Sequence, residues 1–106
     1  MKFTTLIPVC RNDGSKVSRR EMAGIFQRFY GRFGACTVEG PTQGYWMDGG
    51  TLYQDECHKL IVACDEGDLA DAEQLVRDIG RQLGQLAMYF EVDRTSEVRI
   101  LRGEGR

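Results

Sequence analysis

The residues best suited to chemistry lie on one stretch of the chain, residues 44–59. This stretch contains the only tryptophan, the only histidine and one of the four cysteines. The turn residues Asp48, Gly49 and Gly50 divide it into two β-prone arms. An Asp-Gly turn between two such arms predicts a β-hairpin.

Strand alternation decides which side chains of the returning arm can act together. Glu56 and His58 share one face, whereas Cys57 and His58 point to opposite faces. A carboxylate beside an imidazole can orient the ring and tune its proton affinity, so Glu56 and His58 are candidate catalytic residues for acid–base work. The alternative, which we favour, is a pair that only satisfies hydrogen bonds, because no defined nucleophile accompanies the histidine. A β-bulge between Gln54 and Lys59 would reverse the alternation.

Three aromatic side chains, Tyr45, Trp46 and Tyr53, gather near the hairpin turn. Residues opposed across a ladder can form cross-strand aromatic pairs. Because aromatic residues are common to binding pockets and to interface hot spots, we treat these three as candidate ligand-binding residues. Stabilisation of the hairpin, or contact with a second copy of the chain, explains them equally well.

The four cysteines are Cys10, Cys36, Cys57 and Cys64, and no C-x-x-C spacing occurs among them. We therefore predict no metal site. No apolar run is long enough to span a bilayer, and the first residues do not form a signal sequence. The sequence thus predicts a cytoplasmic protein with reduced thiols; a secreted disulfide framework is the disfavoured alternative.

A group of basic residues precedes and opens the first predicted helix: Arg11, Lys16, Arg19 and Arg20. With the helix N-terminus nearby they could bind an anion such as phosphate, although a solvated basic face is the default interpretation. The chain has neither a P-loop nor a G-x-G-x-x-G motif, so no cofactor is predicted. A net charge of −2 and a pI of about 5.4 argue against a general nucleic-acid binder.

The periodicity of apolar residues predicts alternating strands and helices. Strands are expected over residues 3–10, 35–47, 51–65 and 85–93, with helices starting after Ser18 and near Asp68. This order is the ferredoxin-like β-α-β-β-α-β fold, an α+β sandwich with two helices on one face of an antiparallel sheet. Residues 97–102 could add a C-terminal edge strand. We expect one domain over residues 1–102 and a flexible tail over 103–106.

Scattered residues in the first two thirds of the chain resemble a family of small bacterial ferredoxin-like proteins of unknown function. The shared residues are Asp13-Gly14, Val17-Ser18, Glu21, Phe26, Phe33-Gly34, Thr37-Val38, Gly44-x-Trp46, Gly50 and Glu56-x-x-Lys59. The resemblance implies the same strand–helix–hairpin order and implies no activity. The resemblance assigns no role to Cys57 or His58.

These observations favour a binding or interaction module over an enzyme. An antiparallel sheet covered on one side leaves apolar residues on its other face, in residues 3–10 and 60–64. We therefore expect a homodimer formed through a sheet face or edge, with a small molecule as a further partner. The two other hypotheses are a small enzyme using Glu56 and His58, and a contact with an anion or nucleic acid through the basic first loop.

Overall fold

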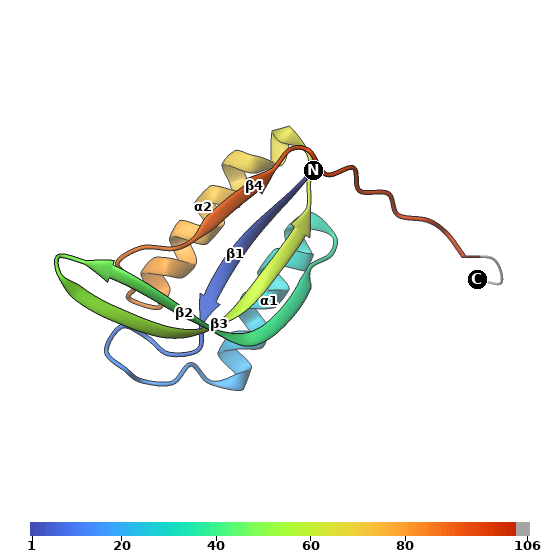
Figure 1. The fold of residues 1–106 in the computed structure, drawn as a ribbon. Helices are drawn as coiled ribbons and strands as arrows, with labels where there is room; N and C mark the ends of the chain where they lie inside the picture. The colour runs from blue at the N-terminus through green and yellow to red at the C-terminus, as the bar shows by residue number, and fades with distance from the viewer. Residues whose placement is uncertain (104–106) are drawn as a thin grey trace.

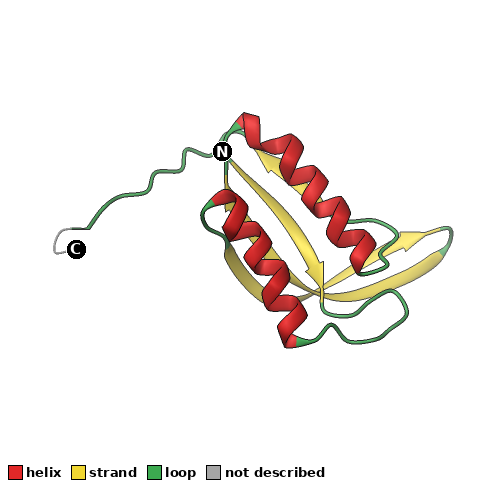
Figure 2. Ribbon diagram, turned by 180° about the vertical axis from the view of Figure 1, so that it is seen from behind, coloured by secondary structure: helices red, strands yellow, loops and turns green. Residues whose placement is uncertain are grey.

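The computed structural model describes residues 1–103 and contains one four-stranded sheet with two α-helices on one face (Figure 1; Figure 2). The elements are β1 (Lys2–Pro8), α1 (Arg19–Phe33), β2 (Thr37–Asp48), β3 (Thr51–Ala63), a short 3₁₀ helix (Glu66–Asp68), α2 (Leu69–Gln82) and β4 (Phe90–Asp93). The strands lie in the order β2, β3, β1, β4, and every pairing is antiparallel. The predicted ferredoxin-like fold is confirmed.

The core lies between the sheet and the two helices. Phe3 of β1 is fully buried, and its ring contacts three others: Phe29 at 6.3 Å, Phe33 at 5.3 Å and Phe90 at 5.3 Å between centroids. The buried side chains of α1 are Met22, Ile25 and Phe29, and those of α2 are Ala72, Val76 and Ile79. These spacings of three and four residues are those of one helical face. Within residues 1–103, no helix is long and apolar enough to cross a membrane.

Pro8 ends β1 and thereby limits the sheet. The Val9 N–H donates to the Glu56 carbonyl at 2.8 Å, which makes Val9 and Glu56 a hydrogen-bonded pair. Because such pairs alternate along an antiparallel ladder, the nitrogen of Pro8 faces away from β3, toward the β4 side. Proline has no N–H to donate there. β4 pairs only with Lys2 to Thr5 of β1.

The β2–β3 hairpin continues beyond this limit. Pro8 pairs with Cys57, but β2 and β3 go on pairing as far as Asp48 and Thr51. We call this two-stranded extension, residues 43–56, the projecting ribbon; it curves away from the sheet in Figure 1. A register shift between Glu39 and Thr42, around Gly40 and Pro41, precedes it. Among residues 1–103, no strand pairs with the edges of the ribbon between Gln43 and Asp55.

Two strand predictions near the C-terminus are wrong. The strand expected over residues 85–93 exists only from Phe90 to Asp93, the residues that pair with Lys2 to Thr5 of β1. The edge strand expected over residues 97–102 is not formed, and this segment has no regular structure. The Asp93 carboxylate accepts hydrogen bonds from the backbone N–H groups of Thr95 and Ser96, forming a turn after which the chain leaves the sheet (Figure 1). Of the tail predicted over residues 103–106, residues 104–106 lie outside the described residues.

Replacement of Phe29 tests the core. Phe29→Ala removes a fully buried ring that contacts Phe3, so we expect the free energy of unfolding to fall by about 3–5 kcal/mol. Urea denaturation followed by circular dichroism measures this change. The matched control is Tyr30→Ala on the same helix, where the side chain is 49% exposed and the loss should stay below about 1 kcal/mol. Equal losses in the two variants would contradict this packing.

Candidate functional site

The aromatic side chains of the projecting ribbon form a cross-strand stack. Trp46 and Tyr53 are directly paired in the ladder, and their rings lie 4.7 Å apart between centroids at an interplanar angle of 22°. Trp46 Nε1 donates a hydrogen bond of 2.9 Å to Asp55 Oδ2. All three side chains lie on the face of the ribbon that continues the open face of the sheet, opposite the helices.

A groove lies where the ribbon leaves the sheet. Its volume is about 440 Å³, within the range of small-molecule sites. Its floor consists of the end of β1 and the adjoining part of β3, with Leu6, Pro8 and Cys57. Trp46 lines one wall, and Ala87 and Tyr89, from the segment before β4, line the other. The groove therefore exists because β1 and β4 stop pairing before the hairpin does.

The predicted ligand-binding residues are divided between the two faces of the ribbon. Trp46 lines the groove, and Tyr53 stacks on Trp46. Tyr45 borders the groove, but its hydroxyl group donates to Gln43 Oε1 at 3.1 Å and accepts from Gln54 Nε2 at 3.4 Å. Those partners belong to the opposite face, so the Tyr45 ring does not join the Trp46 stack.

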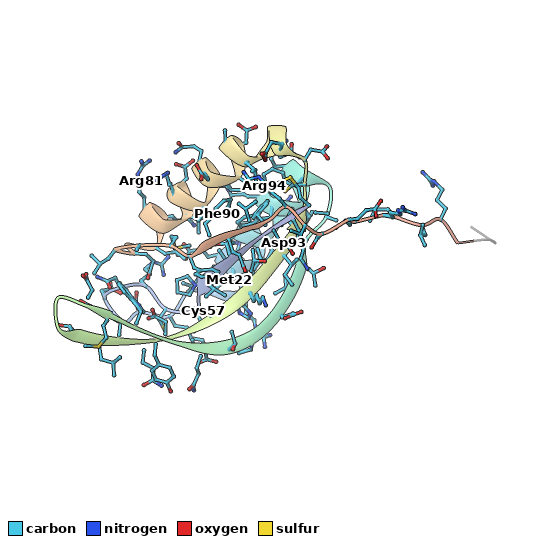
Figure 3. The ribbon with its side chains drawn as sticks, turned by 45° about the horizontal axis from the view of Figure 1, so that its top comes forward. Met22, Cys57, Arg81, Phe90, Asp93 and Arg94 are labelled. Carbon is cyan, nitrogen blue, oxygen red and sulfur yellow. The ribbon has the colours of Figure 1, made fainter. Side chains whose placement is uncertain are left out.

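Cys57 lies in the floor of the groove and is 7% exposed. Figure 3 shows it close to the place where β3 passes the end of β1. Burial raises the pKa of its thiol to about 11, and the negative charges of Asp55 and Glu56 act in the same direction. The thiol is therefore protonated at neutral pH and serves as an apolar surface rather than as a nucleophile.

Glu56 and His58 lie in different environments. His58 shares the helix-facing side of β3 with Leu60, and Phe26 lies edge-on to its ring at 5.5 Å between centroids. Its Nδ1 atom is buried and has no hydrogen-bond partner among the described residues. Glu56 is exposed and lines a separate hollow with Val9. The carboxylate is therefore not the group that satisfies His58 Nδ1.

The predicted anion-binding residues are also separated by their contacts. Arg11 forms an ion pair with Glu21, and Glu21 in addition accepts from Gln82 Nε2 at 3.0 Å. Hydrogen bonds from Gln82 and Arg11 lower the pKa of the Glu21 carboxyl group. Lys16, Arg19 and Arg20 are exposed. The carboxylate at the start of α1 therefore already neutralises part of the positive charge that an anion would need.

The segment 85–89 is the part of the site that sequence reasoning missed. The alternation of its residues predicts a strand, but it crosses beside the end of β1 and lines the groove. The backbone of Tyr89 accepts a hydrogen bond of 2.7 Å from the Thr5 hydroxyl group, and Met88 packs on Gly80 of α2. Gly80 was the one sequence feature that pointed to this contact, since a glycine inside a helix indicates close packing at that position. The sequence did not indicate that Met88 was its partner.

The described residues offer no ready metal site. Within residues 1–103, no group of three or more His, Cys, Asp and Glu side chains could hold a metal ion. The groove presents one carboxylate, Asp55, and one buried thiol, Cys57, each with a structural partner or a protonated state already described. The groove is therefore suited to a ligand that binds through an apolar and aromatic surface.

The fold and the open-faced groove define a small ferredoxin-like α+β protein. No protein-family model matches the chain, and no curated protein matches it in sequence. The solved structures that resemble it include the following two. A divalent cation tolerance protein (CutA1) from Thermus thermophilus has a TM-score of 0.60 and 8% identity, covering 92% of this chain and 88% of its own. A phage SAM lyase in complex with S-methyl-5'-thioadenosine has a TM-score of 0.56 and 10% identity, covering 91% and 92%.

At these identities the likeness shows the fold alone. It confirms that the chain has the ferredoxin-like architecture of these two proteins. The resemblance to small bacterial proteins of unknown function stays a prediction.

Thiol reactivity tests the position of Cys57. In a variant that keeps only Cys57, with serine at the three other cysteine positions, we expect the folded protein to react with a disulfide reagent at about pH 8 more slowly than the unfolded protein does. A pKa of about 11 instead of 9 leaves about 100-fold less thiolate, and burial slows access further. The same variant unfolded in urea is the control. Equal rates in folded and unfolded protein would contradict the buried position.

Proposed function

We propose that this protein is a small binding module, residues 1–102, that holds a planar small molecule in the groove and self-associates through the projecting ribbon. The observation that carries the proposal is the groove itself, about 440 Å³, with Trp46 on one wall and apolar side chains on its floor. Pockets of this size, mainly apolar with few polar groups, are typical of small-molecule sites.

The chemistry of the groove indicates the class of ligand. Trp46 is held by two interactions, the stack on Tyr53 and the hydrogen bond to Asp55, so its position is fixed before a ligand arrives. A ligand ring could stack on an aromatic side chain held in this way. One oxygen of Asp55 is engaged by Trp46, and the other can accept a hydrogen bond from a ligand N–H or O–H group. A heteroaromatic ring with a donor group fits both features.

S-methyl-5'-thioadenosine is a suitable first probe, because it is bound by one of the proteins with a similar fold. We expect binding, measured by isothermal titration calorimetry, to be lost in Ala87→Trp. Ala87 is exposed on the groove wall, so a large side chain there fills the groove without disturbing the core. Trp46→Ala should weaken binding about tenfold or more, because a base stacked on an aromatic ring contributes about 1–3 kcal/mol.

Leu52→Ala is the matched control for these variants. Leu52 lies on the same ribbon but on its other face and is 62% exposed, so ligand affinity should not change. NMR shift mapping with other planar heteroaromatic compounds extends the test beyond one nucleoside. The ligand part of the proposal fails if none of these compounds shifts the groove residues, or if Ala87→Trp binds as tightly as the wild type.

A second feature supports self-association. Tyr45, Met47 and Leu52 lie on one face of the ribbon and are 62%, 64% and 62% exposed. A two-stranded hairpin by itself is marginally stable in water, and it normally needs a third strand or a packed face. This ribbon has neither within residues 1–103. A second copy of the chain could provide the missing contact.

Charged substitutions test self-association. We expect light scattering at micromolar concentration to show a dimer for the wild type and a monomer for Met47→Asp combined with Leu52→Asp. The reason is that carboxylates in a buried apolar contact carry a large desolvation cost. Tyr30→Asp, at a 49% exposed position on α1, is the control and should leave the dimer intact. A wild-type protein that stays monomeric would rule out this part of the proposal.

The remaining predicted roles have less support from the geometry. The Glu56 and His58 side chains differ in environment, and Arg11 is already paired with Glu21. We therefore do not extend the proposal to acid–base catalysis or to anion and nucleic-acid binding. The four cysteines are free thiols, which suits a reducing compartment, and we propose the cytoplasm as its location.

A further inference from the structure

The C-terminal segment of the described chain, residues 97–102, has the pattern of a strand but no strand partner. Val98 and Ile100 alternate with Glu97 and Arg99, as in a β-strand with one apolar face. Val98, Ile100 and Leu101 are 43%, 85% and 83% exposed. Ile100 and Leu101 are thus largely uncovered, which indicates a contact that one copy of the chain does not complete.

We propose that residues 97–102 of one protein molecule add a strand to the β2 edge of the projecting ribbon of a second molecule. The inference rests on the self-association proposed above and names the element that makes it. Strand addition of this kind satisfies backbone N–H and C=O groups at the open edge, while alternate side chains provide specificity. The β2 edge from Gln43 to Asp48 is about as long as the segment that would pair with it.

The direction of the segment excludes its own ribbon as the partner. Figure 1 shows the segment leaving the molecule at the end where the N-terminus lies, whereas the tip of the ribbon lies at the opposite end. The segment follows β4, at one edge of the sheet, and the ribbon belongs to β2, at the other. A second copy can present its ribbon to the segment without this obstacle.

Charge and apolar pattern both agree with this pairing. The ribbon carries Asp48, Asp55 and Glu56 and no lysine or arginine, whereas the segment carries Arg99 and Arg102 against Glu97. In the ribbon, Tyr45 and Met47 share a face, as Val98 and Ile100 do in the segment. Adding the segment as a strand would place these two apolar rows side by side and bring its arginines to an acidic ribbon.

The test uses the full chain and two substitutions at one position. Ile100→Pro removes the N–H group that a ladder needs, and Ile100→Val keeps both the N–H group and the branched side chain. We expect sedimentation equilibrium to show that Ile100→Pro and a chain ending at Ser96 raise the dimer dissociation constant at least about tenfold. Ile100→Val should leave it within about threefold. The circular dichroism of the dissociated monomers should be unchanged, since the segment forms no helix or strand in its own chain.

A mixed sample of isotope-labelled and unlabelled protein then locates the contact. Filtered nuclear Overhauser effects between the Ile100 and Met47 methyl groups of different molecules are the expected result. Contacts of Ile100 with β4 of its own molecule would overturn the inference. A chain ending at Ser96 that dimerises as tightly as the wild type would also overturn it, while leaving self-association through the ribbon intact. A monomeric wild type would overturn both.

Discussion

Strands of unequal length determine much of the architecture around the groove. β1 ends at Pro8 and β4 pairs only with Lys2 to Thr5, while β2 and β3 go on pairing as far as Asp48 and Thr51. The hairpin therefore leaves the sheet as a two-stranded ribbon, and the chain before β4 runs as an irregular segment beside the end of β1. The groove, the open edges and the exposed apolar face of the ribbon are all consequences of strands of unequal length.

The unequal strands also explain how a short chain can present a binding surface and still be stable. The core of Phe3, Phe29 and their neighbours is buried between the helices and the well-paired half of the sheet. The half without helix cover contributes little to that core, and it exposes Tyr45, Met47 and Leu52. The core and the exposed apolar surface thus lie in different halves of one hairpin, and changes in the ribbon should leave the core unaffected.

The sequence predicted the fold better than the site, for identifiable physical reasons. Helix periodicity and the Ser18 cap are local, and they placed α1 correctly; Ser18 Oγ accepts from the Glu21 N–H at 3.1 Å. Strand parity correctly placed His58 on the same side as Leu60. Alternation along the strands allows Trp46 and Tyr53 to lie on the same face. Whether their rings stack depends on the register of the hairpin, which pairs the two residues directly.

What the sequence could not provide depends on distant partners. The capping pattern predicts that Glu21 reaches back to the backbone of Ser18, but Glu21 forms an ion pair with Arg11 and accepts from Gln82 instead. Residues 85–89 alternate like a strand, yet none of them pairs with β1, and Tyr89 accepts a hydrogen bond from the Thr5 side chain instead. Alternation describes what a segment can do, and only the neighbouring strand determines whether it does so.

The polar groups of the groove favour recognition over reaction. Asp55 is engaged by Trp46 Nε1, and this bond orients the indole ring more than it prepares a base. Cys57, the nearest nucleophile, keeps its proton because burial and two neighbouring carboxylates raise its pKa to about 11. His58, the only histidine of the sequence, lies on the opposite face of β3 against Phe26. The groove therefore combines an apolar surface, an aromatic wall held in place by Asp55 and a protonated thiol.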